Sequence, residues 1–332
     1  MIRLSIRFAG ALALGALSLP VFTAAAQQDV PAAPTAQVPS APAPAAAAPV
    51  FPKLDPANFN AAGPSVEAVN NYWNTFWGWQ DNIAWQVQAI LKTPIDGLSQ
   101  AIILTAEKGS KTESHAQAFF ITVDGKHVIV GNGIIPSNEH PFAETRAQLQ
   151  QRADGPYRGA ASKDLELVEF AAFQCPYCKA AQANMEQLAV DFPKARIVFQ
   201  NSPLPKEKHP ADAVAAAYGV CVSKQGGSGA FFTFAAAVFE GQDGLASADG
   251  ATLTLNSAAT KAGLVPAAIA TCAADPATVA AVEASSKLAQ DLGIYSLPAL
   301  LINGRPVPAN APYETLKKMV LHQAKLDGVA AQ

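Results

Sequence analysis

One stretch of the sequence constrains the fold more than any other. Residues 167–179, LVEFAAFQCPYCK, are an apolar run followed by a short turn and two cysteines that are separated by two residues. After the second cysteine, large or small apolar residues recur at helical spacing until Pro193 ends the pattern: Ala181, Met185, Leu188 and Phe192. The pattern predicts a strand, a turn and a helix that begins at the Cys-x-x-Cys.

This placement has a chemical consequence. The first turn of a helix has unpaired N–H groups and a partial positive charge, which stabilise a thiolate. We therefore expect Cys175 to have a lowered pKa and to be the attacking sulfur. Cys178 lies one turn later, so it can form a disulfide with Cys175 or resolve a mixed disulfide. Pro176 suits the first helical position, where its missing N–H costs nothing.

Other uses of a Cys-x-x-Cys fit the sequence less well. A zinc site needs about four ligands, but the remaining cysteines, Cys221 and Cys272, are far apart in the sequence. A c-type haem site needs histidine after the second cysteine, and Lys179 is found there. A purely structural disulfide would not need the strand-to-helix context. Redox chemistry is the favoured interpretation.

The stretch resembles the active-site segment of the thioredoxin superfamily, in its DsbA-like branch of bacterial envelope proteins. A second segment, IYSLPALLING at residues 294–304, is similar to the cis-proline loop, strand and turn of the same family. The resemblance implies that Pro298 is a cis-proline packed against the Cys175–Cys178 disulfide, and that Leu297 pairs its backbone with an extended substrate. Leu297 stands where the family often has Thr or Val. Pro176 and Tyr177, between the cysteines, are expected to affect the thiolate and contact substrate.

Glu169 is a further candidate for the chemistry. It shares one face of the predicted strand with Leu165 and Leu167, while Val168 and Phe170 occupy the other. Both faces are apolar, so we expect a central strand and a buried carboxylate with a raised pKa. It matches an acidic residue that DsbA-like proteins carry before the motif, thought to shuttle a proton for the second cysteine. The alternative is a glutamate that reaches a strand end or pairs with a lysine.

The resemblance implies a helical insertion between the two halves of the thioredoxin fold, at about residues 209–275. Cys221 and Cys272 both fall within it, and several DsbA-like relatives carry a second cysteine pair there. We expect a structural disulfide between them; two free buried thiols are the alternative. His209 opens this region, and a protease-like Cys175–His209 pair is conceivable, although His209-Pro210 resembles the family's helix start.

The N-terminal part of the chain reads as an export signal and a spacer. Residues 1–26 have a positive n-region with Arg3 and Arg7, an apolar core and a small-residue cleavage site, which is typical of a signal peptide; a membrane anchor is the alternative. Residues 27–55 are rich in Ala and Pro with few large apolar side chains, so we expect an extended linker. Export explains how disulfides persist.

Residues 56–138 predict a small α+β domain, with a helix after Ser65, alternating strands and an Asp124-Gly125 hairpin. The segments TPIDGLSQAIIL and FFITVDGKHVIVGNGII resemble the cystatin-like N-terminal domain of the DsbC and DsbG isomerases, which dimerises those proteins. All four Trp lie between Trp73 and Trp85; they could form such an interface or an ordinary core. Residues 139–162 are expected to be a linker helix, and residues 163–332 the thioredoxin-like domain.

The expected fold class is therefore α/β: a thioredoxin-like fold with a helical insertion, preceded by a small α+β domain. The formal charge is −3 and no basic run is present, which gives no support for a nucleic-acid partner. We expect a periplasmic thiol–disulfide oxidoreductase without metal or organic cofactor. Its partners would be cysteine-containing exported proteins and a membrane redox protein that resets the disulfide. A dimeric isomerase or reductase of DsbC/DsbG type, or a chaperone with secondary redox activity, stays open.

Overall fold

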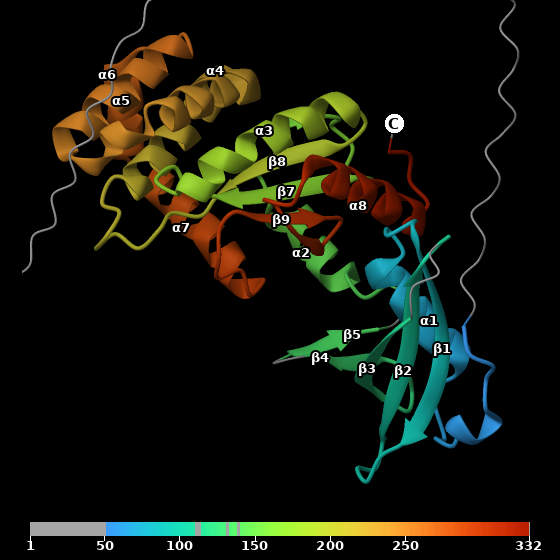
Figure 1. Cartoon of the computed structure of the whole chain (residues 1–332). Helices are drawn as coiled ribbons and strands as arrows, with labels where there is room; N and C mark the ends of the chain where they lie inside the picture. Colours follow the sequence, from blue (N-terminus) through green and yellow to red (C-terminus); the bar gives the residue numbers. More distant parts are fainter. Residues whose placement is uncertain (1–50, 110–113, 131–132, 138–139, 332) are drawn as a thin grey trace, which may run out of the picture. The chain divides into compact units, whose positions relative to one another are not determined.

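The computed structural model describes residues 51–109, 114–130, 133–137 and 140–331 (Figure 1). The expected signal peptide and most of the expected Ala/Pro-rich linker lie outside these residues.

The N-terminal region folds as one helix against an antiparallel sheet. The sheet has the order β1-β2-β3-β4-β5, so each strand pairs with the next along the chain. Ser65 caps the helix, because its hydroxyl accepts the Ala68 N–H at 3.1 Å. The hairpin turn at Asp124-Gly125 joins β3 and β4, and Gly125 has a φ of 72°, which suits glycine. The elements are η1 (Pro56–Asn58), α1 (Val66–Trp77), β1 (Ile83–Lys92), β2 (Leu98–Glu107), β3 (His115–Thr122), β4 (His127–Val130) and β5 (Gly133–Pro136).

The tryptophans pack mainly inside this region. Trp73 is buried and stacks on Trp77 with ring centroids 4.8 Å apart, and Trp85 packs against the same cluster. Val69 and Tyr72 of α1 complete the contact with the sheet. Of the two uses considered for the tryptophans, core packing therefore accounts for these three.

A second, mixed sheet forms the centre of the C-terminal region, with the order β10-β9-β7-β8-β6. The central strand is β7, which runs parallel to β8 and antiparallel to β9. All six of its residues are buried, which confirms the prediction of a central strand with two apolar faces. The strands are β6 (Tyr157–Gly159), β7 (Glu166–Ala171), β8 (Arg196–Asn201), β9 (Ala299–Ile302) and β10 (Arg305–Pro308).

Helices cover both faces of this sheet. Leu167 packs with α3 (Pro176–Asp191) and α8 (Tyr313–Leu326) on one face. Phe170 packs with α2 (Ala143–Arg152) and α7 (Pro276–Asp291) on the other. Figure 1 shows the same two layers.

The sheet reaches further toward the N-terminus than the boundary expected at residue 163. Strand β6 pairs with β8, and Leu149 of α2 packs on Val168 and Phe170. The short strand escaped prediction because three residues at a sheet edge carry no visible periodicity. The segment expected as a linker helix thus contributes to the core of the thioredoxin-like region.

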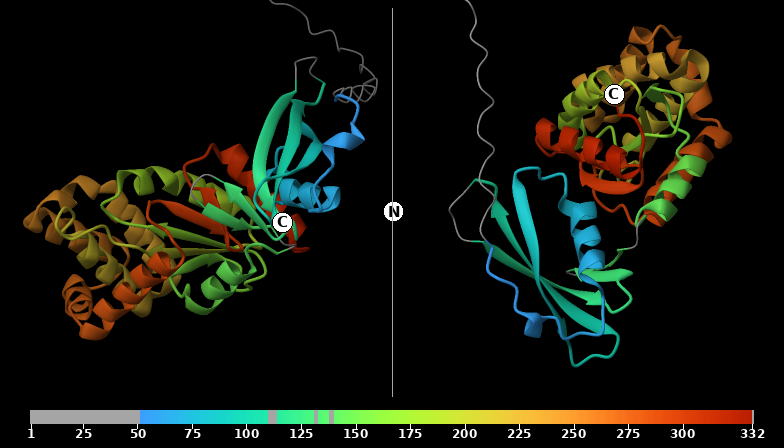
Figure 2. Two further views of the ribbon diagram at one scale, coloured as in Figure 1. Left: turned by 90° about the horizontal axis from the view of Figure 1, so that it is seen from below. Right: turned by 90° about the vertical axis from the view of Figure 1, so that its right-hand side faces the viewer.

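The helical insertion lies between β8 and α7. It comprises α4 (Asp212–Glu240), η2 (Gln242–Ala246), α5 (Ala248–Lys261) and α6 (Pro266–Ala273). Gly227 interrupts α4 with a φ of 75°, a conformation that favours glycine, so α4 is two helices joined at a kink. Figure 2 shows these helices, in yellow and orange, packed together at one end of the sheet. Among the described helices none is by itself long and apolar enough to cross a membrane, although the bent pair α6 and α7 passes that test by length and composition.

Candidate active site

The two motif cysteines lie at the start of α3, a few residues after the end of β7. Cys175 is the N-cap of α3, and Pro176 occupies the first helical position. Its sulfur accepts the Cys178 backbone N–H at 3.2 Å. The exposed fraction of Cys175 is 5%, whereas Cys178 is fully buried. The first turn of the helix therefore directs the Cys178 N–H, which also donates to the Cys175 carbonyl at 3.1 Å, at the outer of the two sulfurs.

The two thiols differ in pKa because their surroundings differ. The pKa of Cys175 is lowered to about 7, first because the Cys178 thiol donates to it and also because the backbone N–H groups of Cys178 and Tyr177 do so. Burial and the carboxylate of Asp212 oppose this lowering. The pKa of Cys178 is raised, because it donates to Cys175 and is buried. Cys175 is thus the more acidic thiol of the pair.

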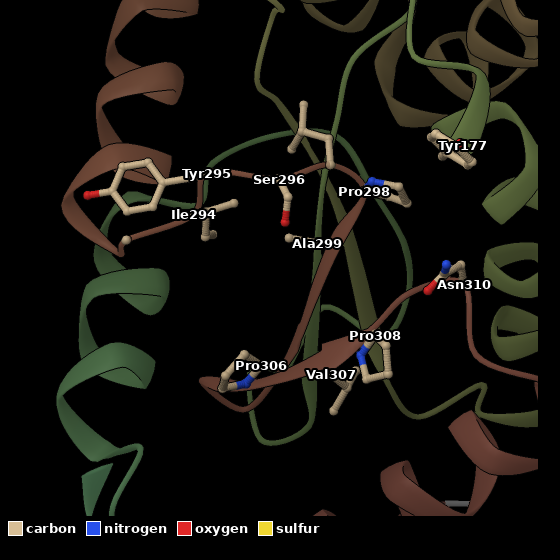
Figure 3. A pocket seen from close by; sticks show the side chains of 12 residues that line it. Tyr177, Ile294, Tyr295, Ser296, Pro298, Ala299, Pro306, Val307, Pro308 and Asn310 are labelled. Atoms are coloured by element: carbon tan, nitrogen blue, oxygen red, sulfur yellow. The ribbon is translucent and has the colours of Figure 1, made fainter. Parts of the chain in front are cut away.

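The loop before β9 faces the cysteines. The Leu297–Pro298 peptide bond is cis, and the Leu297 carbonyl oxygen lies 3.8 Å from the Cys175 sulfur. A groove of about 590 Å³ runs along this loop. In Figure 3 Pro298 lies between Tyr177, from the start of α3, and Tyr295. The groove is lined by Tyr177, Gly293, Ile294, Tyr295, Ser296, Leu297, Pro298, Ala299, Pro306, Val307, Pro308 and Asn310.

Glu169 lies behind the cysteines, inside the domain. Its exposed fraction is 2%, and burial is the main reason why its pKa is raised to about 7. The Gln182 side-chain amide donates to its Oε1 at 2.9 Å and to the Cys178 carbonyl at 3.1 Å. Gln182 was missed in the sequence, although its position one helical turn after Cys178 could have indicated it. The carboxylate and the inner cysteine are connected through this one amide.

The second cysteine pair has quite different surroundings. Cys221 in α4 and Cys272 in α6 form a disulfide in the structure, with Cα atoms 5.9 Å apart. The Thr278 hydroxyl lies 3.6 Å from the Cys221 sulfur. Cys221 is fully buried. Elsewhere in the described part of the chain, no group of three or more His, Cys, Asp or Glu side chains is arranged to hold a metal ion.

Two further residues that the sequence did not indicate hold the loop before Cys175. Asp212, in the first turn of α4, accepts the Gln174 backbone N–H at 3.1 Å. Gln242, in η2, donates to the carbonyl oxygens of Phe173 and Cys175. Both come from the insertion and are more than 35 residues away from the motif in the chain, so no local pattern could have associated them with it.

The sequence model of a protein family described as thioredoxin matches residues 151–321, which is more than half of the chain. The chain belongs to this thioredoxin family. The match covers the second sheet, the Cys-x-x-Cys, the insertion and the Pro298 loop, and it confirms the expected thioredoxin-like α/β fold with its helical region. It also supports the expected class of enzyme, a protein-disulfide oxidoreductase.

Several solved structures are similar to the thioredoxin-like region. A thioredoxin-like oxidoreductase from Silicibacter pomeroyi is 26% identical, with a TM-score of 0.46, over 54% of this chain and 97% of the other. BdbD from Bacillus subtilis is 21% identical, with a TM-score of 0.47, over 52% and 93%. The thiol-disulfide exchange protein alpha-DsbA2 from Wolbachia pipientis is 22% identical, with a TM-score of 0.46, over 54% and 96%.

One curated protein is also similar in sequence. It is the Na(+)/H(+) antiporter NhaA 3 of Salinispora tropica, which is 34% identical over 92 residues. These residues are 28% of this chain and 14% of that protein, so the chain matches about a seventh of the antiporter's length.

Proposed function

We propose that this member of the thioredoxin family is an exported protein thiol–disulfide oxidoreductase whose redox centre is Cys175–Cys178. The observation that carries the proposal is the position of the Cys175 sulfur. It accepts the Cys178 N–H at the start of α3 and lies 3.8 Å from the Leu297 carbonyl, beside the groove. A thiolate is stabilised there and a client disulfide can approach it.

The reaction is a pair of exchanges that conserve electrons. The Cys175 thiolate attacks one sulfur of a client disulfide, the client S–S bond breaks, and one client thiolate leaves. Cys178 then loses its proton to Glu169, attacks the Cys175 sulfur and releases the second client thiolate. The client is reduced and the pair is oxidised; the reverse sequence oxidises a client dithiol. A pKa of about 7 for Glu169 suits a group that takes and returns a proton near neutrality.

The groove is the proposed client site. An extended client segment would lie along Leu297 and Pro298, and Tyr177 and Tyr295 would contact its side chains. Their exposed fractions are 68% and 89%, so both rings are free to be covered. Recognition mainly through backbone and exposed aromatic rings suits an enzyme with many clients.

Trapping of the mixed disulfide tests the proposal. A Cys178→Ser variant is expected to accumulate a covalent complex with a disulfide-containing client such as insulin, because the resolving sulfur is missing. A Cys175→Ser variant is the matched control and should form none. Mass spectrometry of the complex identifies the linked cysteine. Absence of a complex on Cys175, with the protein folded, would show that the pair is not a redox centre.

The direction of the reaction depends on the reduction potential against glutathione. A value of about −120 mV would indicate an oxidase in envelope conditions, and a value of about −270 mV a reductase. The proposed partners are cysteine-containing exported proteins and a membrane redox protein that resets the pair. Localisation in the periplasm follows from the expected signal peptide.

A dimeric isomerase is the second candidate. It is favoured by the N-terminal antiparallel sheet, where Phe120 on β3 and Ile134 on β5 are exposed to 42% and 67%. Light scattering would give the oligomeric state, and a Phe120→Glu/Ile134→Glu variant should become monomeric if these residues form the dimer interface. A dimer that reactivates scrambled ribonuclease more than the monomeric variant does would support isomerase activity. Full biological activity of a Cys175→Ala/Cys178→Ala variant would instead favour a chaperone.

A further inference from the structure

The segment before Cys175 is held from the insertion side rather than by its own strand. Strand β7 ends at Ala171, and Cys175 is the N-cap of α3. Phe173 and Gln174 therefore cross from sheet to helix without ladder hydrogen bonds. The direction in which Cys175 presents its sulfur depends on how this crossing is fixed.

Asp212 fixes one side of the crossing. Its carboxylate accepts the Gln174 N–H at 3.1 Å and the Leu204 N–H at 2.8 Å. The residue has no exposed surface. A buried carboxylate that accepts two backbone N–H groups is costly to place unless those bonds are made, so the two bonds define its position closely.

Gln242 fixes the other side. Its side-chain amide donates to the Phe173 carbonyl at 2.7 Å and to the Cys175 carbonyl at 3.1 Å. The Gln174 side chain completes the contact by donating to the Leu245 carbonyl at 3.0 Å. The elements that carry these partners, the start of α4 and η2, are both part of the insertion.

We infer that Asp212 and Gln242 are positioning residues that clasp residues 173–175 and thereby set the reactivity of Cys175. The inference rests on the proposed function, because it concerns the sulfur that attacks the client. It gives the helical insertion a defined part in the chemistry: the insertion supplies one acceptor and one donor to the loop that precedes the nucleophile.

The two residues should act on the thiolate with opposite sign. Asp212 places a negative charge near Cys175, which disfavours the thiolate. Gln242 satisfies two carbonyl oxygens close to the same sulfur, and without it their partial negative charges would be uncompensated. Loss of Asp212 should therefore favour the thiolate, and loss of Gln242 should disfavour it. Simple loosening of the loop would move the thiolate equilibrium in one direction for both.

The experiment compares Asp212→Asn, Gln242→Met and Gln242→Glu with the parent chain. Methionine keeps the length of glutamine but cannot donate, and glutamate adds a charge that faces the two carbonyls. Gln225→Ala is the matched control, since Gln225 is an exposed glutamine of the same insertion. The thiolate is followed by its ultraviolet absorbance against pH in the reduced proteins, and the redox equilibrium is measured against glutathione.

We expect the thiolate fraction of Cys175 near pH 7 to fall in Gln242→Met, with the acid dissociation constant of the Cys175 thiol lowered by about threefold to tenfold, the range that corresponds to loss of an ordinary hydrogen bond. The fall should be larger in Gln242→Glu. Asp212→Asn should raise the fraction and make the disulfide more oxidising. The control should match the parent. Circular dichroism and thermal unfolding check that each variant is folded.

Equal titration curves in all folded variants would overturn the inference, and so would a change of the same sign in Asp212→Asn and Gln242→Met. If Gln242→Met does not fold, Asp212→Asn still tests the inference: a higher thiolate fraction supports it, and an equal or lower fraction overturns it. The titration does not require turnover. A parent chain that forms no mixed disulfide would refute the proposed function, while the titration would still report whether the clasp controls Cys175.

Discussion

Cys175–Cys178 and Cys221–Cys272 are two pairs of the same side chain in one domain. The first pair is separated by three positions and lies at the N-terminus of α3, beside a groove. The second pair is separated by 51 positions, joins α4 to α6 and has a threonine hydroxyl beside it.

The comparison shows which surroundings make a cysteine reactive. A sulfur becomes a nucleophile where N–H groups stabilise its thiolate and a substrate can reach it. The Cys175 sulfur accepts such an N–H and lies 3.8 Å from the carbonyl oxygen of Leu297, a residue of the groove, and a buried carboxylate lies behind its partner. Cys221 is fully buried between helices. The first pair is therefore expected to perform chemistry and the second to hold the insertion together.

The largest expected effect is on activity. A Cys175→Ala variant should lose at least about a thousandfold in the rate of insulin reduction or of client oxidation, because the attacking sulfur is gone. A Cys221→Ala/Cys272→Ala variant, assayed at a temperature where it is folded, should keep the parent rate within about threefold. If the second variant were as inactive as the first while folded, the division of roles between the pairs would be wrong.

For stability we expect the opposite order: loss of the second cysteine pair should cost more unfolding free energy than loss of the first. Removing Cys221–Cys272 opens a closed loop of 51 residues, which in the chain-entropy model costs about 4 kcal/mol of unfolding free energy. Urea unfolding of the Cys221→Ala/Cys272→Ala variant measures this loss. The Cys175→Ala/Cys178→Ala variant is the control and should lose less, because its loop is far shorter. A stability equal to that of the oxidised parent would mean that the second disulfide does not brace the fold.

Glu169 allows a test through pH. Its pKa is raised from 4.5 to about 7 in the folded protein, so folding disfavours the ionised carboxylate. The resulting penalty is absent below pH 4.5, grows as the pH rises from 4.5 to 7, and is complete above pH 7, where it amounts to about 3 kcal/mol. Glu169→Gln should therefore stabilise the protein above pH 7 and match it below pH 4.5.

The same variant should react more slowly in the second exchange step, because Cys178 loses its proton acceptor. Stopped-flow measurement of mixed-disulfide decay against pH would detect this. An unchanged decay rate, together with the expected gain in stability, would make Glu169 a buried carboxylate without a part in the reaction.

The smallest expected effect concerns the groove. Tyr177→Ala and Tyr295→Ala should each raise the KM for a peptide client by about threefold, in line with a partly covered aromatic contact of roughly 0.5–1 kcal/mol. The rate with a small reagent such as glutathione should not change for Tyr295→Ala, because glutathione is too short to reach along the groove. Identical KM values for long clients would place the client elsewhere.

The sequence by itself determined the elements whose cause is local. Periodicity and capping predicted α3 with Cys175 at its start, and the apolar faces of β7 predicted that Glu169 is buried; the structure has both. The strand and turn expected within residues 294–304 are also present, and both residues of the turn, Asn303 and Gly304, have positive φ. These features are decided within about a dozen neighbouring residues, by helix geometry, strand alternation and turn chemistry.

Only the tertiary structure decided which distant groups meet at the sulfur. Asp212 and Gln242 reach the loop before Cys175 because the insertion folds back on it, and the Leu297 carbonyl belongs to the loop before β9, more than 100 residues later in the chain. Strand β6 and the role of α2 in the core likewise depend on pairing with β8 and packing on β7. Such contacts are set by chain topology and close packing, which leave no period in the sequence.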